Sequence, residues 1–136
     1  MQNRESKRAA ICGVSFIALS ESTVTNVPGV SQIKVSGIWK QIKFSSADFS
    51  EQLSSDATNY EVNLTISFSD SSQENQKEVM EWTGIYILVR LDYTDGNSRV
   101  VGSDQFPVVL CLSGEGSPHA IRLTYKGQQP ESSKFL

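Results

Sequence analysis

The clearest sign of secondary structure in this chain is the segment Tyr60-Glu61-Val62-Asn63-Leu64-Thr65-Ile66-Ser67-Phe68. Its apolar side chains alternate strictly with polar ones, and a repeat of two residues is the period of a β-strand. One face of such a strand packs on a core while the other meets water. The chain therefore contains a half-buried strand at residues 60–68.

A second alternating run follows at residues 85–93 and is apolar on part of both faces. One face carries Ile85, Ile87, Val89, Leu91 and Tyr93, and the other carries Tyr86, Leu88, Arg90 and Asp92. We expect a central strand, or a strand whose outer face meets another surface. The sequence Thr94-Asp95-Gly96-Asn97 comes next, and Asp-Gly supplies the positive φ of a tight hairpin turn. A return strand is expected at residues 98–103.

The remaining segments complete an all-β pattern. We expect further strands at residues 11–19, 32–35, 38–44, 108–112 and 121–125. The polar, serine-rich residues 45–59 and 69–78 are predicted as loops, the first with a helical turn around residues 48–53. No segment shows an apolar stripe of helical period. The sequence predicts one antiparallel β-sandwich of about seven to eight strands, with a small, partly open β-barrel as the alternative.

Length and composition limit the chain to one domain. It has 136 residues, of which 38% are hydrophobic, enough for a core. We expect a flexible lead at residues 1–9 and a C-terminal arm or tail at residues 127–136, which lacks any period. The 12 basic and 15 acidic residues give a net charge of −3, which argues against a nucleic-acid partner. No apolar stretch reaches the ~18–20 residues that span a bilayer.

The N-terminal residues leave two locations open. Residues 1–20 combine early basic residues with a short apolar run, a pattern typical of a secretory signal. Glycine and serine interrupt that run, so we prefer a first strand and a cytoplasmic or virion-associated protein. If the segment acts as a signal, the protein is secreted or periplasmic. Cys12 and Cys111 match no zinc motif, and we expect two free, buried thiols, with a disulfide between them as the alternative.

Residues for catalysis, metal binding or cofactor binding are sparse. His119 is the single histidine, so a nucleophile–histidine pair or a metal site would depend on it alone. Oxygen-rich side chains lie close together at Asp92, Asp95, Asn97 and Asp104, but their spacing does not match a calcium loop, and turn formation explains them. We therefore predict no enzyme, no cofactor and no metal site.

Aromatic and apolar side chains are the better candidates for function. Trp39 and Trp82 stand at strand boundaries, where they either close the ends of the core or contact a partner. Tyr86 and Leu88 lie opposite the main core stripe, and they would need a partner if that face were exposed. Phe135 lies in the predicted C-terminal arm. These five residues form the predicted interaction site.

The C-terminal part of the chain combines an apolar strand and a D-G turn at residues 82–96 with the segments Arg99-Val100-Val101-Gly102-Ser103 and Phe106-Pro107-Val108. Residues 117–127 and 130–136 complete this pattern. With this pattern the chain resembles small all-β proteins of Bacteroidetes prophages and mobile elements. It implies a non-enzymatic assembly protein, such as a phage tail or neck component. It implies no catalytic residues.

Two functions follow from these observations. The first is a non-enzymatic structural or interaction protein that binds a protein partner or a second copy of itself. The alternative is a secreted or periplasmic β-sandwich module that binds carbohydrate or a surface protein, with Trp39, Trp82 and Tyr86 as flat contacts.

Overall fold

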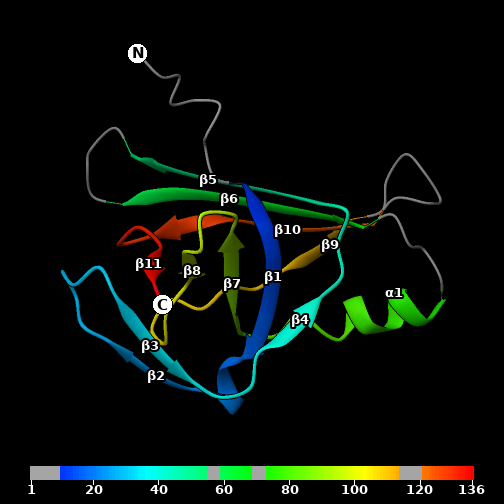
Figure 1. Ribbon diagram of the computed structural model, residues 1–136, viewed down its shortest axis with the longest axis horizontal. Helices are drawn as coiled ribbons and strands as arrows, with labels where there is room; N and C mark the ends of the chain where they lie inside the picture. The colour runs from blue at the N-terminus through cyan, green and yellow to red at the C-terminus, as the bar shows by residue number, and fades with distance from the viewer. Residues whose placement is uncertain (1–9, 55–58, 69–72, 114–120) are drawn as a thin grey trace.

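The computed structural model describes residues 10–54, 59–68, 73–113 and 121–136 of the chain, and these form a nearly all-β protein (Figure 1). The elements in chain order are β1 (Ile11–Ala18), the 3-10 helix η2 (Leu19–Glu21), β2 (Thr23–Asn26), β3 (Ile33–Ser36), β4 (Lys40–Ile42), β5 (Ser46–Leu53), β6 (Tyr60–Phe68), α1 (Gln73–Met80), β7 (Ile87–Tyr93), β8 (Ser98–Val101), β9 (Cys111–Ser113), β10 (Ile121–Gln129) and β11 (Lys134–Phe135). The predicted lead at residues 1–9 and His119 lie outside the described residues.

Two antiparallel sheets face each other. The first has the strand order β11-β8-β7-β1-β4, and the second has the order β5-β6-β10-β9. Their strands run in crossing directions in Figure 1. Within the described residues, the strand order of neither sheet closes into a barrel. The predicted antiparallel sandwich is therefore confirmed, and the barrel alternative is not. The described residues form eleven strands, where about seven to eight were predicted.

The main core lies between the two sheets. The alternating stretch at residues 60–68 is β6, and its side chains Val62, Leu64, Ile66 and Phe68 are all buried there. The opposite sheet contributes inward residues from β1 and β7: Val14, Phe16, Ile87, Val89 and Leu91. Burial of each large apolar side chain contributes roughly 1.5–3 kcal/mol. The apolar residues of the period-two pattern at residues 60–68 are thus the ones that enter the core.

The hairpin of β2 and β3 forms a small third sheet that packs on the outer face of the first sheet. Beneath it lies a second apolar cluster in which Leu88 of β7 is fully buried, together with Ile17, Ile33 and Val100. Val24, Val35 and Trp39 pack around these residues. The apolar outer face of β7 therefore meets another surface of the same chain, which fulfils one of the two expectations for this strand.

Residues 46–53 form strand β5, where the sequence predicted a loop with a helical turn. β5 pairs with β6 along its whole length, from Ser46 opposite Ser67 to Leu53 opposite Tyr60. It is an edge strand, so its outward side chains stay in water and only Ala47, Phe49 and Glu51 are partly buried. Because most of its residues are polar, β5 could not be recognised as a strand from the sequence.

The predicted loop at residues 69–78 is wrong over its second half, where helix α1 forms. Val79 of α1 is buried in the main core, and Lys40 Nζ of β4 lies 3.9 Å from Glu78 Oε1. Among residues 77–80, the part of α1 whose side chains are described, Val79 is the one buried residue, and a single buried position gives no helical stripe.

The C-terminal residues pack on the rest of the domain, where the sequence predicted an arm or tail. Residues 127–129 extend β10, and Lys134–Phe135 form β11, which pairs with β8. Gln129 and Lys134 are buried. Polar residues hold this segment in place by hydrogen bonds, which an apolar pattern does not reveal.

Both cysteines are free, as expected, but both are exposed, so the prediction of burial is wrong. Cys12 lies where the β1–β7 register shifts between Ile11 and Gly13, and Cys111 lies on the edge strand β9. Among the described residues, no helix is long and apolar enough to cross a membrane.

Candidate functional site

Residues 130–136, here called the C-terminal strap, join all three sheets at one end of the sandwich. The ammonium group of Lys134 is almost fully buried and meets three acceptors: Asn26 Oδ1 at 2.6 Å, the Val27 carbonyl at 2.9 Å and Glu131 Oε1 at 3.1 Å. The other oxygen of Glu131 accepts the Gly29 backbone N–H at 2.7 Å. Since an ammonium has three N–H donors, the Lys134 group is saturated. These bonds tie the strap to the β2–β3 hairpin.

A second set of contacts ties the strap to both large sheets. Glu51 of β5 accepts the Ser133 backbone N–H at 2.6 Å and the Ser133 hydroxyl at 2.9 Å. Arg99 of β8 lies 3.8 Å from Glu51 and also stacks over Phe135, with its Cζ atom 4.7 Å from the ring centroid. The Phe135 backbone N–H donates to the Ser31 carbonyl at 2.9 Å. The strap is therefore held from three directions.

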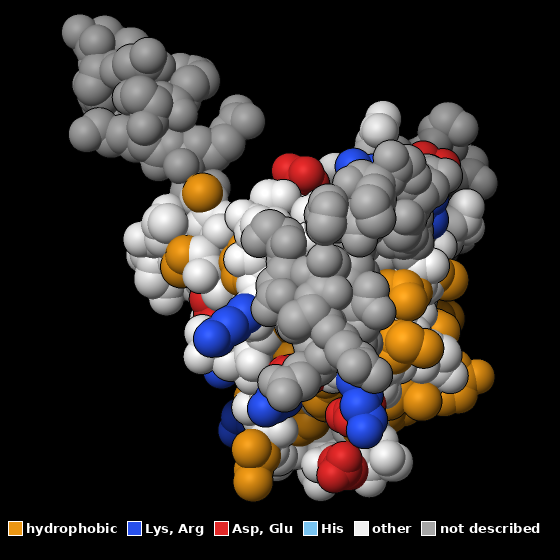
Figure 2. All heavy atoms as spheres, turned by 90° about the vertical axis from the view of Figure 1, so that its right-hand side faces the viewer, with side chains coloured by type: hydrophobic (Ala, Val, Ile, Leu, Met, Phe, Trp, Pro, Cys, Tyr) orange, Lys and Arg blue, Asp and Glu red, His pale blue; other side chains and the backbone are white. Residues whose placement is uncertain are grey.

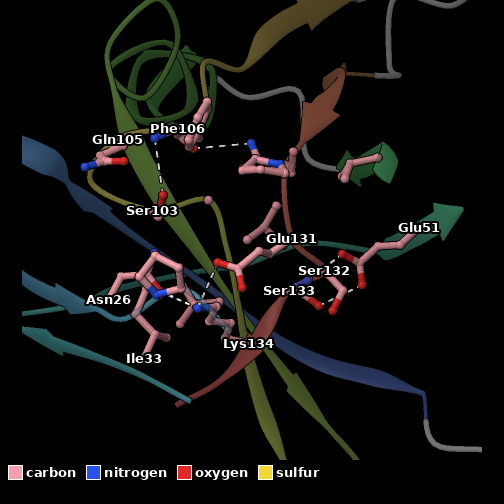
Figure 3. A pocket seen from close by; sticks show the side chains of 17 residues that line it. Asn26, Ile33, Glu51, Ser103, Gln105, Phe106, Glu131, Ser132, Ser133 and Lys134 are labelled. Carbon is pink, nitrogen blue, oxygen red and sulfur yellow. Dashed lines mark hydrogen bonds and ion pairs between the residues drawn. The ribbon is translucent and has the colours of Figure 1, made fainter. Parts of the chain in front are cut away.

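A cavity of about 330 Å³ lies beneath the strap. Its volume is at the lower end of the ~300–1,000 Å³ found for ligand pockets. Ile33, Val62, Val100 and Val101 give it an apolar wall. Figure 3 shows Ser103, Gln105 and Phe106 on one side, the Glu131–Lys134 pair on another, and Glu51 with Ser133 apart from both.

The turn at residues 102–106 positions the aromatic side of the cavity. Gly102 has a φ of 95°, a left-handed value that favours glycine. The Ser103 backbone N–H donates to the Phe106 carbonyl at 3.1 Å, and the Phe106 N–H donates to Ser103 Oγ at 3.2 Å. Gln129 donates from Nε2 to the same carbonyl and to Tyr125 Oη, at 3.2 and 2.8 Å. The Phe106 ring is thus presented by a turn with fixed backbone contacts, and it remains 44% exposed.

The Glu131 carboxyl has a pKa below its ordinary value of 4.5. The hydrogen bond from the Gly29 backbone is the main cause, and the bond and charge of Lys134 act in the same direction. The Gly29 hydrogen bond and the Lys134 ammonium both favour the ionised form of Glu131 in the folded protein. The stabilisation is complete above the ordinary pKa and is lost as the pH falls through the lowered value.

Replacing Glu131 with glutamine should therefore reduce the loss of stability on acidification. We expect the unfolding free energies of wild type and Glu131→Gln to differ most at neutral pH and to converge as the pH falls below the lowered pKa of Glu131. Urea unfolding across this range measures the difference. Glu61→Gln, at an exposed position of β6, is the control and should follow wild type. A constant difference across the range would contradict the assigned role of Glu131.

A second surface feature is an open hollow of about 770 Å³ at the start of β7, here called the Tyr86 surface. Its lining residues carry no charge and are Ala18, Leu19, Ser20, Gly84, Ile85, Tyr86 and Val109. Tyr86 is 64% exposed and Ile85 is 41% exposed. The Leu19 backbone N–H donates to the Tyr86 carbonyl at 3.0 Å, and that of Gly84 donates to Leu110 at 3.3 Å. Hydrogen bonds to the rest of the domain therefore hold this loop.

The structure separates the five predicted interaction residues. Trp82 packs against the main core, with its ring centroid 5.6 Å from that of Phe16, and Trp39 packs on the second cluster. Leu88 is fully buried, so its predicted place on a contact surface is wrong: the β2–β3 hairpin covers that face. Phe135 is half-buried against Arg99. Only Tyr86 lies on an open apolar surface.

The acidic side chains around the β7–β8 turn serve the turn itself. Asp95 accepts the Asn97 backbone N–H at 3.0 Å, and Asp92 Oδ1 accepts from Arg90 Nε at 2.9 Å and from Ser98 Oγ at 2.6 Å. Within the described ranges, no group of three or more histidine, cysteine or acidic residues is arranged to hold a metal ion.

Sequence reasoning missed the strap and the cavity. Glu51, Gln129, Glu131 and Lys134 lie in polar segments far apart in the chain, and nothing in their spacing brings them together. A local signal for one side of the cavity is present in Gly102 and Pro107, which flank the turn that carries Phe106 and are residues typical of turns. No protein-family model matches this chain, and neither a curated protein nor a solved structure shows significant similarity to it.

Proposed function

We propose that this chain is a non-enzymatic structural protein that assembles with a second copy of itself through the Tyr86 surface. The observation that best supports self-association is the uncharged, apolar hollow of this surface, with the exposed side chain of Tyr86 beside it. Depletion of charge and enrichment in tyrosine are the compositional marks of interface centres. The fixed backbone of the loop lowers the entropy lost on binding.

The choice of a second copy rests on self-complementarity. The same surface carries a projecting aromatic side chain and a hollow lined by Leu19 and Val109. In a twofold dimer each copy contributes the same patch, so each Tyr86 can enter the hollow of the other copy. The resemblance to mobile-element proteins favours the same class, a tail or neck type assembly component. The proposal places the protein in the cytoplasm or in a virion particle.

Other hydrophobic side chains are also exposed, and they provide controls. Figure 2 shows hydrophobic side chains gathered toward one margin of the α1 side, with charged side chains spread elsewhere. Leu53 on β5 is 47% exposed and does not line the Tyr86 surface. It therefore offers a matched exposed position on the opposite sheet.

Substituting Tyr86 with serine should abolish self-association without loss of folding. Size-exclusion chromatography with light scattering should give wild type a mass above the 15.0 kDa monomer at about 100 μM, hundredfold above a micromolar dissociation constant. Tyr86→Ser should remain monomeric at that concentration, while Leu53→Ser should behave as wild type. A wild-type protein that stays monomeric, or equal effects of both variants, would contradict the proposal.

A further inference from the structure

We infer that the cavity beneath the C-terminal strap is a binding site for a small neutral sugar. It shares no lining residue with the Tyr86 surface, so this inference goes beyond the proposed function and is independent of it.

The charges in the cavity are already paired. Its charged lining residues are Glu51, Glu131 and Lys134. Lys134 is bound by Glu131 and two neutral acceptors, and Glu51 is held by Ser133 and faces Arg99. A charged ligand would lose its hydration without gaining a free opposite charge, which is unfavourable. The site therefore selects an uncharged molecule.

The apolar side of the cavity suits a molecule with a nonpolar face. Val62, Val100 and Val101 form its wall, and the half-exposed Phe106 ring borders it. An aromatic face carries partial negative charge and attracts the weakly positive C–H groups of a sugar ring. Aliphatic walls accept the same C–H groups. One face of a pyranose ring meets both requirements.

The polar side offers groups that remain available for hydroxyls. Both Nε2 hydrogens of Gln129 are donated, but no described residue donates to its Oε1 atom. The side chains of Gln105 and Ser132 are exposed at the cavity and make no hydrogen bond within the described part of the chain. Amide and hydroxyl groups both donate and accept, as sugar hydroxyls do. A purely apolar ligand would leave these groups unpaired.

The test is a titration of the full chain with glucose, galactose, mannose and N-acetylglucosamine, followed by backbone amide NMR. We expect at least one of these sugars to cause saturable shifts at Gln105, Phe106 and Gln129 below about 10 mM, tenfold above a millimolar dissociation constant. Glucuronate and glucosamine, which carry a charge, should bind at least about tenfold more weakly.

Variants connect the binding to the cavity. Phe106→Ala keeps the backbone contacts of the turn and should weaken sugar binding about tenfold. Leu112→Ala removes a side chain of similar exposure (43%) outside the cavity and should bind as wild type. Gln105→Ala removes an exposed polar side chain of the cavity and tests whether this side chain contributes to sugar binding.

Several results would overturn the inference. These are no shift with any of the four neutral sugars, shifts outside the cavity residues, or equal binding of the charged sugars. Unchanged binding by folded Phe106→Ala would do the same, and so would a response to hexanol without a response to sugar.

Discussion

Replacing Leu88 with alanine is expected to lower the free energy of unfolding by about 3 kcal/mol. Leu88 is fully buried between β7 and the β2–β3 hairpin, where it contacts the cluster around Ile17, Ile33 and Val100. Truncation removes buried apolar surface and leaves a cavity, and such Leu→Ala changes cost about 2–5 kcal/mol. Urea unfolding followed by tryptophan fluorescence measures the difference, because Trp39 packs on the same cluster.

Leu112→Ala is the matched control for this prediction. Leu112 is also a leucine in a strand, but it is 43% exposed on the edge strand β9. Surface substitutions of this kind usually change stability by less than about 0.5 kcal/mol. If Leu88→Ala lowered the free energy of unfolding no more than Leu112→Ala does, the hairpin would not cover the outer face of β7. Leu88 would then again be a candidate for the interaction site predicted from the sequence.

Replacing Lys134 with alanine is expected to destabilise the fold by about 2–4 kcal/mol. The substitution leaves Asn26, the Val27 carbonyl and Glu131 without the ammonium that joins them. Removing one partner of a buried ion pair costs about 3–5 kcal/mol, and partial exposure of Glu131 reduces that cost. Thermal and urea unfolding measure the loss, and faster proteolysis at the C-terminal strap should accompany it.

Lys126→Ala tests whether the effect belongs to the buried position. Lys126 is an exposed lysine on β10, so its loss should be nearly neutral. Lys134→Met separates charge from packing, because it keeps the aliphatic stem. We expect it to recover only part of the loss. Equal stability of Lys134→Ala and wild type would show that the strap is not anchored, in agreement with the arm predicted from the sequence.

Local patterns in the chain predicted the main strands for a clear reason. β6 buries alternate residues, and β7 points Ile87, Val89 and Leu91 into the main core with the same spacing, so the side-chain chemistry of both strands repeats with the period of the backbone. The β7–β8 turn was predictable because Gly96 adopts a φ of 92°, which Asp-Gly sequences favour. β5 and α1 were missed because few of their described side chains enter the core. Their polar surfaces resemble loops in composition.

The candidate sites were much less predictable than the strands. Tyr86 and Leu88 lie on the same face of the alternating run at residues 85–93, yet one is largely exposed and the other fully buried. The difference comes from the β2–β3 hairpin, more than fifty residues earlier in the chain, which covers only Leu88. Periodicity states which residues share a face, but it does not state what covers that face.

An antiparallel β-sandwich could be predicted from the sequence, because alternation and turn chemistry are local properties of consecutive residues. The position of the C-terminal strap, the cavity that it borders and the set of exposed apolar side chains follow instead from tertiary contacts. Those features depend on contacts such as Lys134 with Asn26 and Ser133 with Glu51, which join residues 82 or more positions apart. Such contacts form only when the sheets bring distant segments together.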